Sequence, residues 1–168
     1  MESIMKNTKI FSFSLALAAI FTTLFAVGCA SGPRAYNLTI TKPSYASIEV
    51  DLIGIMKADE PYWLAVNVDK YWSGEGDTHR KNANRLSQIL TKGQPWTVSI
   101  KDPKWQEWMN HGATELLVMA NLPGHFEAGQ GDPRRRFLPL KDWITKNNTI
   151  EIQVQDDMIQ PLTPQKTK

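Results

Sequence analysis

Short segments with a strand-like pattern recur along most of this chain, and they constrain its fold more than any other feature. Apolar and polar residues alternate in four of them, and two others are largely apolar. The segments are residues 36–40, 48–55, 63–68, 96–100, 116–120 and 150–155, with a shorter one at 136–138. A period of two places apolar side chains on one face of a β-strand. The sequence therefore predicts an all-β fold of roughly seven strands, a two-sheet β-sandwich with antiparallel pairing.

Two stretches depart from this period. In residues 77–90 the later apolar positions recur every three or four residues, which predicts one inserted helix that Gly93 ends. In residues 102–111, Asp102 can cap a helix, Pro103 suits its first position, and Gly112 follows. We expect this second stretch to be a short helix or a single helical turn laid on the sheet.

The first 29 residues have the pattern of a secretory signal peptide. Lys6 and Lys9 precede an uncharged run over residues 10–27, and small residues lead to Cys29. A membrane-spanning helix is one alternative, but the run is only about 18 residues long and ends in polar and small residues. Simple secretion is another, and it would leave an unpaired thiol in an oxidising compartment.

The run Ala26-Val27-Gly28-Cys29 resembles the lipobox of bacterial lipoproteins. The resemblance implies that Cys29 is lipidated and becomes the first residue of the mature protein. The family usually has Leu where this chain has Ala26. Lipoproteins retained at the inner membrane have Asp after the cysteine, whereas this chain has Ala30. The resemblance therefore implies a lipid anchor in the outer membrane, on its periplasmic face.

Cleavage before Cys29 would divide the 168 residues into four parts. They are a signal peptide (1–28), a lipidated cysteine with a short tether (29–35), a β-sandwich domain (36–160) and a flexible tail (161–168). About 140 residues remain, the size of one domain. The signal peptide carries two of 19 basic and one of 17 acidic residues, so the mature net charge of about +1 gives no reason to expect a nucleic-acid partner.

Candidates for metal binding and catalysis are few. His79, His111 and His125 lie in three different segments without the spacing of metal ligands. Acidic residues between positions 51 and 77 could include a catalytic pair, but no pattern brings two of them together. The chain has no Gly-x-Ser-x-Gly motif, and its one cysteine belongs to the lipobox. We therefore expect no catalytic residue, no metal, no cofactor and no enzymatic activity.

Residues 122–137 form the most distinctive segment. Pro-Gly and Asp-Pro pairs indicate a long loop, and Arg134, Arg135 and Arg136 follow it. Guanidinium groups suit carboxylates and phosphates, so these arginines are candidates for binding an acidic protein partner, lipid head groups or lipopolysaccharide. The alternative is a solvated loop in which one arginine pairs with Asp132 or Glu127.

The six tryptophans allow a second kind of site. Trp72 and Trp143 lie at the edges of expected loops and are the candidates for surface aromatics that stack on sugar rings. Core packing is the alternative for all six, and the more frequent role of tryptophan.

The order of these features resembles the outer-membrane lipoprotein of type VI secretion systems. A lipobox lies close before one β-rich domain, a helical insertion (77–90) follows the third strand, and a long loop (122–136) precedes the last strand (150–155). The resemblance implies a two-sheet β-sandwich of transthyretin-like shape, with a loop that docks on an inner-membrane partner. It implies a non-enzymatic component of an envelope-spanning assembly. A carbohydrate- or small-ligand-binding lipoprotein and an envelope hydrolase remain the alternatives.

Overall fold

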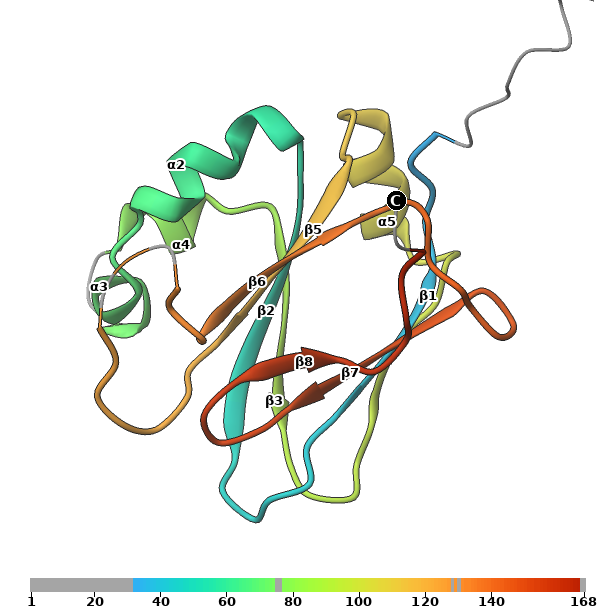
Figure 1. Ribbon diagram of the computed structural model, residues 1–168. Coiled ribbons are helices and arrows are strands. Elements are labelled where there is room, and N and C mark those ends of the chain that lie inside the picture. Colours follow the sequence, from blue (N-terminus) through green and yellow to red (C-terminus); the bar gives the residue numbers. More distant parts are fainter. Residues whose placement is uncertain (1–31, 75–76, 128, 130, 167–168) are drawn as a thin grey trace, which may run out of the picture. The chain divides into compact units, whose positions relative to one another are not determined.

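Two four-stranded sheets face each other in the computed structural model, which describes residues 32–74, 77–127, 129 and 131–166 (Figure 1). Their strand orders are β4-β1-β7-β8 and β3-β2-β5-β6. The predicted all-β, two-sheet β-sandwich is confirmed. The predicted signal peptide and the lipidation of Cys29 lie outside the described residues and stay predictions.

The first sheet contains β1 (Asn37–Thr41), β4 (Trp96–Val98), β7 (Thr149–Val154) and β8 (Ile159–Pro161). Strand β1 pairs antiparallel with β4 but parallel with β7, so the expectation of antiparallel pairing is wrong for one pair. Leu38 and Ile40 of β1 and Ile150 and Ile152 of β7 pair side by side and are buried in the interior between the sheets.

The second sheet contains β2 (Ile48–Ile55), β3 (Arg85–Leu90), β5 (Glu115–Ala120) and β6 (Arg135–Pro139), all antiparallel. Every residue of β5 is buried. Leu116 and Val118 belong to the core between the sheets, whereas Leu117 and Met119 belong to a second core on the outer face. The continuous apolar run of β5 therefore reflects a strand that is covered on both faces.

Three short helices cover that outer face: α2 (Glu60–Ala65), α3 (Val68–Trp72) and α4 (Thr78–Asn82) (Figure 1). The strand predicted at residues 63–68 is wrong, because this stretch is the end of α2 and the start of α3. Pro61 lies in the first turn of α2, and the Asn67 side chain caps α3 by accepting a hydrogen bond from the Lys70 amide at 3.0 Å. Trp63 and Val66, three residues apart, are both buried in the second core.

The helix predicted over residues 77–90 is confirmed only in its first part. It ends at Asn82, and β3 pairs from Arg85 onward with β2. In β3, Leu90 is buried between the sheets while Ile89 is 60% exposed. The apolar spacing of three and four residues therefore does not reflect a helix. It arises because residues 85–90 form an exposed edge strand in which Ile89 points outward.

The helix predicted over residues 102–111 is confirmed as α5 (Pro103–Asn110). The Asp102 side chain caps it by accepting a hydrogen bond from the Lys104 amide at 2.8 Å. Trp105 and Trp108 are fully buried, and they close one end of the interior between the sheets. Trp108 lies directly over Gly54 of β2, where a Cβ atom would overlap the indole.

The C-terminal residues are fastened to the sandwich, so the flexible tail predicted for residues 161–168 is wrong for residues 161–166. The Leu162 amide donates to the Glu151 carbonyl at 2.8 Å, and the Lys166 amide donates to the Asp142 carbonyl at 2.7 Å. None of the helices within the described residues has the length and apolar character needed to cross a membrane.

Candidate partner-binding surface

The first predicted site residue, Arg134, is enclosed within the fold. Its Nε and one terminal nitrogen donate to the Asp132 carboxylate at 3.0 and 2.8 Å, and the other terminal nitrogen pairs with Asp69 of α3. The guanidinium also stacks on the Phe126 ring at 5.1 Å. The two carboxylates raise its pKa, Asp132 most of all. Arg134 therefore ties the long loop to helix α3.

Arg135 is 5% exposed and lies on the helix-covered face of β6. One terminal nitrogen donates to the carbonyls of Trp63 and Val66 at 2.7 and 3.1 Å, and the other to the Gly129 carbonyl. The first two carbonyls are at the end of α2, where helix carbonyls lack partners within the helix. Burial lowers the pKa of Arg135. This side chain therefore fastens α2 to β6.

Partner binding by all three arginines would require exposed side chains, but Arg134 and Arg135 are buried and bond acceptors of the protein itself. The pairing of one arginine with Asp132 is confirmed for Arg134. Arg136 alone is exposed. Its side chain alone among the three remains accessible, and its binding to a partner stays a prediction.

The two predicted surface tryptophans are not brought together. Trp143 is 5% exposed and belongs to the core between the sheets, where its indole nitrogen donates to the Pro139 carbonyl. Trp72 is half-buried against the second core, and the Arg80 guanidinium lies 4.4 Å above its ring. The expectation of a surface site is therefore wrong for Trp143, and these two residues line no common groove.

A buried ionic cluster lies on the helix-covered face around Asp51, which is completely inaccessible. Its carboxylate accepts hydrogen bonds from Tyr71 at 2.8 Å, from Arg80 at 2.9 Å and from Ser87 at 2.5 Å. Burial, together with the Asp51 charge, raises the pKa of Tyr71. Both carboxylate oxygens have donors, so the cluster fastens α3 and α4 to the sheet and offers no free base for catalysis.

The histidines considered as metal ligands are also far from forming a common site. His79 contacts the Tyr62 hydroxyl, and the His111 ring bonds the Glu107 carbonyl. Among the residues that the structure describes, no three His, Cys, Asp or Glu side chains are grouped as metal ligands.

The loops of the sandwich gather at two opposite ends (Figure 1). At one end the described chain begins, and the Arg34 amide donates to the Leu140 carbonyl at 2.9 Å. Strand β1 then carries the chain about 17 Å, at roughly 3.3 Å per residue, to the other end. There the β1–β2 loop (42–47) meets the β3–β4 loop (91–95) and the β7–β8 loop (155–158).

The β1–β2 loop presents Tyr45, which is 85% exposed. The loop is held from below because the buried Lys42 ammonium and the Ser44 hydroxyl bond the Asp156 carboxylate at 2.7 and 2.6 Å. These bonds, that of Lys42 first, lower the pKa of Asp156. The Lys92 ammonium lies 3.6 Å from the centre of the Tyr45 ring, a cation–π contact. These bonds tie the start of the β1–β2 loop to the β7–β8 loop, and the Tyr45 ring is exposed next to them.

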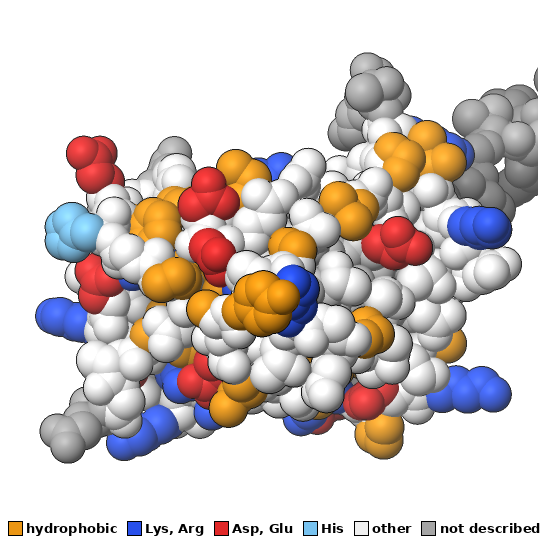
Figure 2. Space-filling model, turned by 90° about the horizontal axis from the view of Figure 1, so that it is seen from below, with side chains coloured by type: hydrophobic (Ala, Val, Ile, Leu, Met, Phe, Trp, Pro, Cys, Tyr) orange, Lys and Arg blue, Asp and Glu red, His pale blue; other side chains and the backbone are white. Residues whose placement is uncertain are grey.

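Figure 2 views the molecule from this end. Hydrophobic side chains lie there singly or in small groups among charged ones of both signs. Sequence reasoning missed Tyr45, although an aromatic residue in a Pro- and Ser-containing turn between two strands is a signal that could have drawn attention to it.

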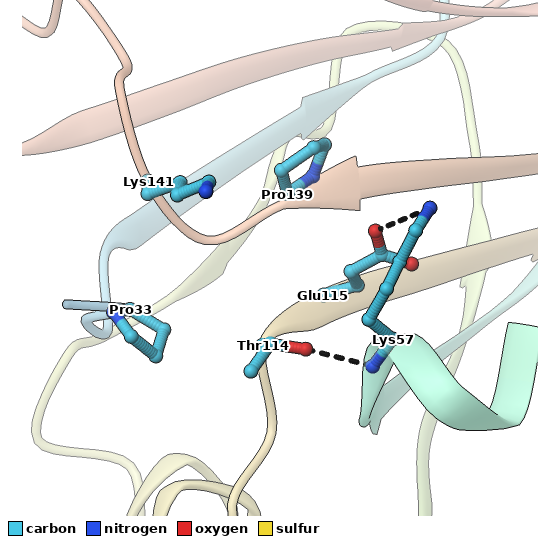
Figure 3. Close-up of a pocket in the computed structure, with 6 residues that line it drawn as sticks. All are labelled: Pro33, Lys57, Thr114, Glu115, Pro139 and Lys141. Atoms are coloured by element: carbon cyan, nitrogen blue, oxygen red, sulfur yellow. Dashed lines mark hydrogen bonds and ion pairs between the residues drawn. The ribbon is translucent and has the colours of Figure 1, made fainter.

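A cavity of about 400 Å³ lies at the opposite end, where the described chain begins (Figure 3). Its lining residues are Pro33, Lys57, Thr114, Glu115, Pro139 and Lys141. Glu115 is 4% exposed, and its Oε1 atom accepts from the Lys57 ammonium at 3.1 Å. Its Oε2 atom has no hydrogen-bond partner within the described part of the chain. Sequence reasoning missed this carboxylate, which begins the apolar strand β5.

Comparison with known proteins finds likeness in structure only. No protein-family model matches the sequence, and no curated protein matches it. A chain from the structure of the type VI secretion protein TssM C-terminal domain from EAEC is similar, with a TM-score of 0.50 and 14% identity over 76% of this chain and 99% of that one.

Two further solved structures are of type VI secretion components. Serratia marcescens Lip, a membrane-bound component, has a TM-score of 0.48 and 15% identity over 77% of this chain and 98% of its own. The lipoprotein TssJ1 from Pseudomonas aeruginosa has a TM-score of 0.45 and 12% identity over 80% of this chain and 99% of its own. At 14% identity, the likeness to the TssM-structure chain is a likeness of fold alone. The likenesses to Lip and TssJ1, with TM-scores below 0.5, carry no further argument.

Proposed function

We propose that this protein is a membrane-anchored lipoprotein that serves as a non-enzymatic component of an envelope-spanning, secretion-type assembly. Cys29 is its lipid attachment site, and the domain lies on the periplasmic face of the outer membrane. The observation that carries the proposal is that the start of the described chain and the exposed Tyr45 lie at opposite ends of the sandwich. The described chain begins at one end, and the β1–β2 loop, hydrogen-bonded to Asp156, presents Tyr45 at the other.

The geometry gives each end a separate task. An anchor that precedes Gly32 leaves the β1–β2 loop on the far side of the domain, where it can meet a protein that reaches toward the membrane. An aromatic ring on a fixed loop loses little conformational freedom on binding, which suits it to an interface anchor. The fold likeness to a chain of a type VI secretion structure supports an assembly role.

The anchor is tested by Cys29→Ser. Several acyl chains on one residue hold a protein firmly, whereas one chain gives marginal binding. We expect the wild-type domain in the membrane fraction and the variant in the soluble fraction, or as an uncleaved precursor. Mass spectrometry of the membrane-bound protein decides the chemistry, because an unmodified Cys29 there contradicts the proposal.

The docking role is tested by placing a photo-crosslinking amino acid at position 45 in cells. The control is the same substitution at Tyr62 of α2, an exposed tyrosine on the helical layer. We expect an adduct with an envelope secretion component from position 45 only. The proposal fails if both positions give the same adducts, or if position 45 gives none. The same assay with Arg136 as the site tests its predicted contact.

A further inference from the structure

Three hydrogen bonds hold together the segments that line the cavity at the end of the sandwich where the described chain begins. The Lys57 amide donates to the Thr114 hydroxyl at 2.8 Å, and the Leu140 amide donates to the Thr114 carbonyl at 2.9 Å. The Arg34 amide, next to Pro33, donates to the Leu140 carbonyl. Its volume of about 400 Å³ lies within the usual range of small-molecule sites.

The charges around this cavity are of both signs. Glu115 and Lys57 lie on one side and Lys141 with Pro33 on the other (Figure 3). The Glu115 Oε2 atom is buried without a donor among the described residues, an arrangement that costs free energy until a donor arrives. Lys141 is exposed and has no ion pair within the described residues.

The charges that line the cavity determine which class of ligand fits it. A simple anion would meet the Glu115 carboxylate, and a simple cation would meet Lys57 and Lys141. Lys57 is already paired with the Glu60 and Glu115 carboxylates, so Lys141 is the lining lysine left for an anion. A small zwitterion that carries a primary ammonium and a phosphate satisfies both remaining groups, with an N–H donor for Oε2 and phosphate oxygens for Lys141. The rings of Pro33 and Pro139 supply apolar walls for the carbons between the two charged groups.

We propose that this cavity binds the phosphoethanolamine head group of a membrane phospholipid. The choice of a lipid source rests on the proposed function, because Pro33 follows the proposed attachment site Cys29 by four residues. Four extended residues span at most roughly 13–14 Å, so the anchoring membrane is within reach of the cavity. The lipid anchor and the head-group site would together fix how the domain lies against the membrane.

The test uses the full chain in detergent micelles and follows its melting temperature with soluble probes. The probes are O-phosphoethanolamine, O-phosphocholine, ethanolamine and inorganic phosphate, compared at equal ionic strength. We expect a saturable rise with O-phosphoethanolamine alone, since a ligand that binds only the folded state stabilises it. Phosphocholine is the matched control because it has the same charges but no N–H donor. An equal rise with phosphocholine or phosphate overturns the proposal, and so does no rise at all.

Variants locate the site. Each of Glu115→Gln and Lys141→Ala should raise the half-saturating concentration of O-phosphoethanolamine at least about tenfold, measured against its own baseline melting temperature. Lys146→Ala removes an exposed lysine of the same connection that does not line the cavity, and it should change nothing. Lys141 is on the surface, so its variant remains informative if Glu115→Gln folds poorly. Unchanged binding in the Lys141 variant contradicts the assignment.

The lipid source is tested separately in phosphatidylcholine nanodiscs with and without phosphatidylethanolamine. We expect a higher melting temperature when phosphatidylethanolamine is present, and no such difference for Lys141→Ala. A response to the soluble probe without a response to the lipid overturns the membrane assignment. The soluble-probe result does not depend on lipidation, so failure of the Cys29 test and failure of this site are distinguishable.

Discussion

Replacing Arg135 by Ala should destabilise the protein severely, although arginines at loop ends are usually solvated. The guanidinium serves three backbone carbonyls, two at the end of α2 and one in the long loop. Each buried acceptor left without its donor costs about 1–3 kcal/mol. Among the described residues no carboxylate is bound to this desolvated charge, so its removal returns part of that cost. We therefore expect a loss of about 3–5 kcal/mol in the free energy of unfolding.

The measurement is urea unfolding of the Arg135→Ala and Arg136→Ala variants, with thermal melting as a second readout. Arg136 is the matched control, since it is the next residue on the same strand and is exposed. Its variant should lie within about 0.5 kcal/mol of the wild type. At roughly 3–5 °C per kcal/mol for a domain of this size, Arg135→Ala should melt about 10–20 °C lower.

A local readout separates the proposed mechanism from general damage. Because Arg135 holds the end of α2, amide hydrogens of α2 and α3 should lose protection from exchange before those of β1 and β7. Arg135→Lys should recover only part of the stability, because one ammonium cannot span three carbonyls in the planar geometry of a guanidinium. Equal, small effects of Arg135→Ala and Arg136→Ala would refute the reasoning.

Four further outcomes follow from packing and charge. Gly54→Ala should cost about 1–3 kcal/mol or more in unfolding free energy, because a Cβ there would overlap an indole. Asp51→Asn should cost about 1–3 kcal/mol, because the half-buried Arg80 loses one of its two carboxylate partners, and Tyr71→Phe about 1–2 kcal/mol, both by urea titration. The pKa of Asp156 is lowered by Lys42, so its stabilising effect is complete above about pH 4 and disappears as the pH falls through the folded pKa. Acid titration should therefore show the stability gap between wild type and Asp156→Asn closing below about pH 4.

The strand pattern of the sequence predicted most of the sandwich because period two is a direct consequence of one-sided burial. It succeeded at residues 150–155, where Ile150, Ile152 and Val154 point into the interior. It failed at residues 63–68, where a short apolar run fits a strand and a buried helix equally well. In the structure, Pro61 lies in the first turn of α2 and Asn67 caps α3, two helix-start signals that the sequence analysis did not use.

The sites were harder to predict because their partners are distant in sequence. Arg135 bonds carbonyls 69 and 72 residues away, and backbone acceptors have no signature in a sequence. Trp143 stands next to a turn yet is buried, because residues 161–166 return to cover that end of the sheet. The Glu115 carboxylate begins an apolar strand and becomes notable only because the fold pairs it with Lys57 and makes it part of the wall of a cavity.

The arginine segment shows how the same strand period divides three identical residues between fold and surface. Strand β6 begins at Arg135, so alternate side chains point to opposite faces of the sheet. Arg135 and Phe137 lie on the helix-covered face, and Arg136 lies on the other side at the exposed edge. Arg134 precedes the strand and is enclosed by two carboxylates. Of the three arginines, only the Arg136 side chain is therefore left exposed, and its contact with a partner stays a prediction.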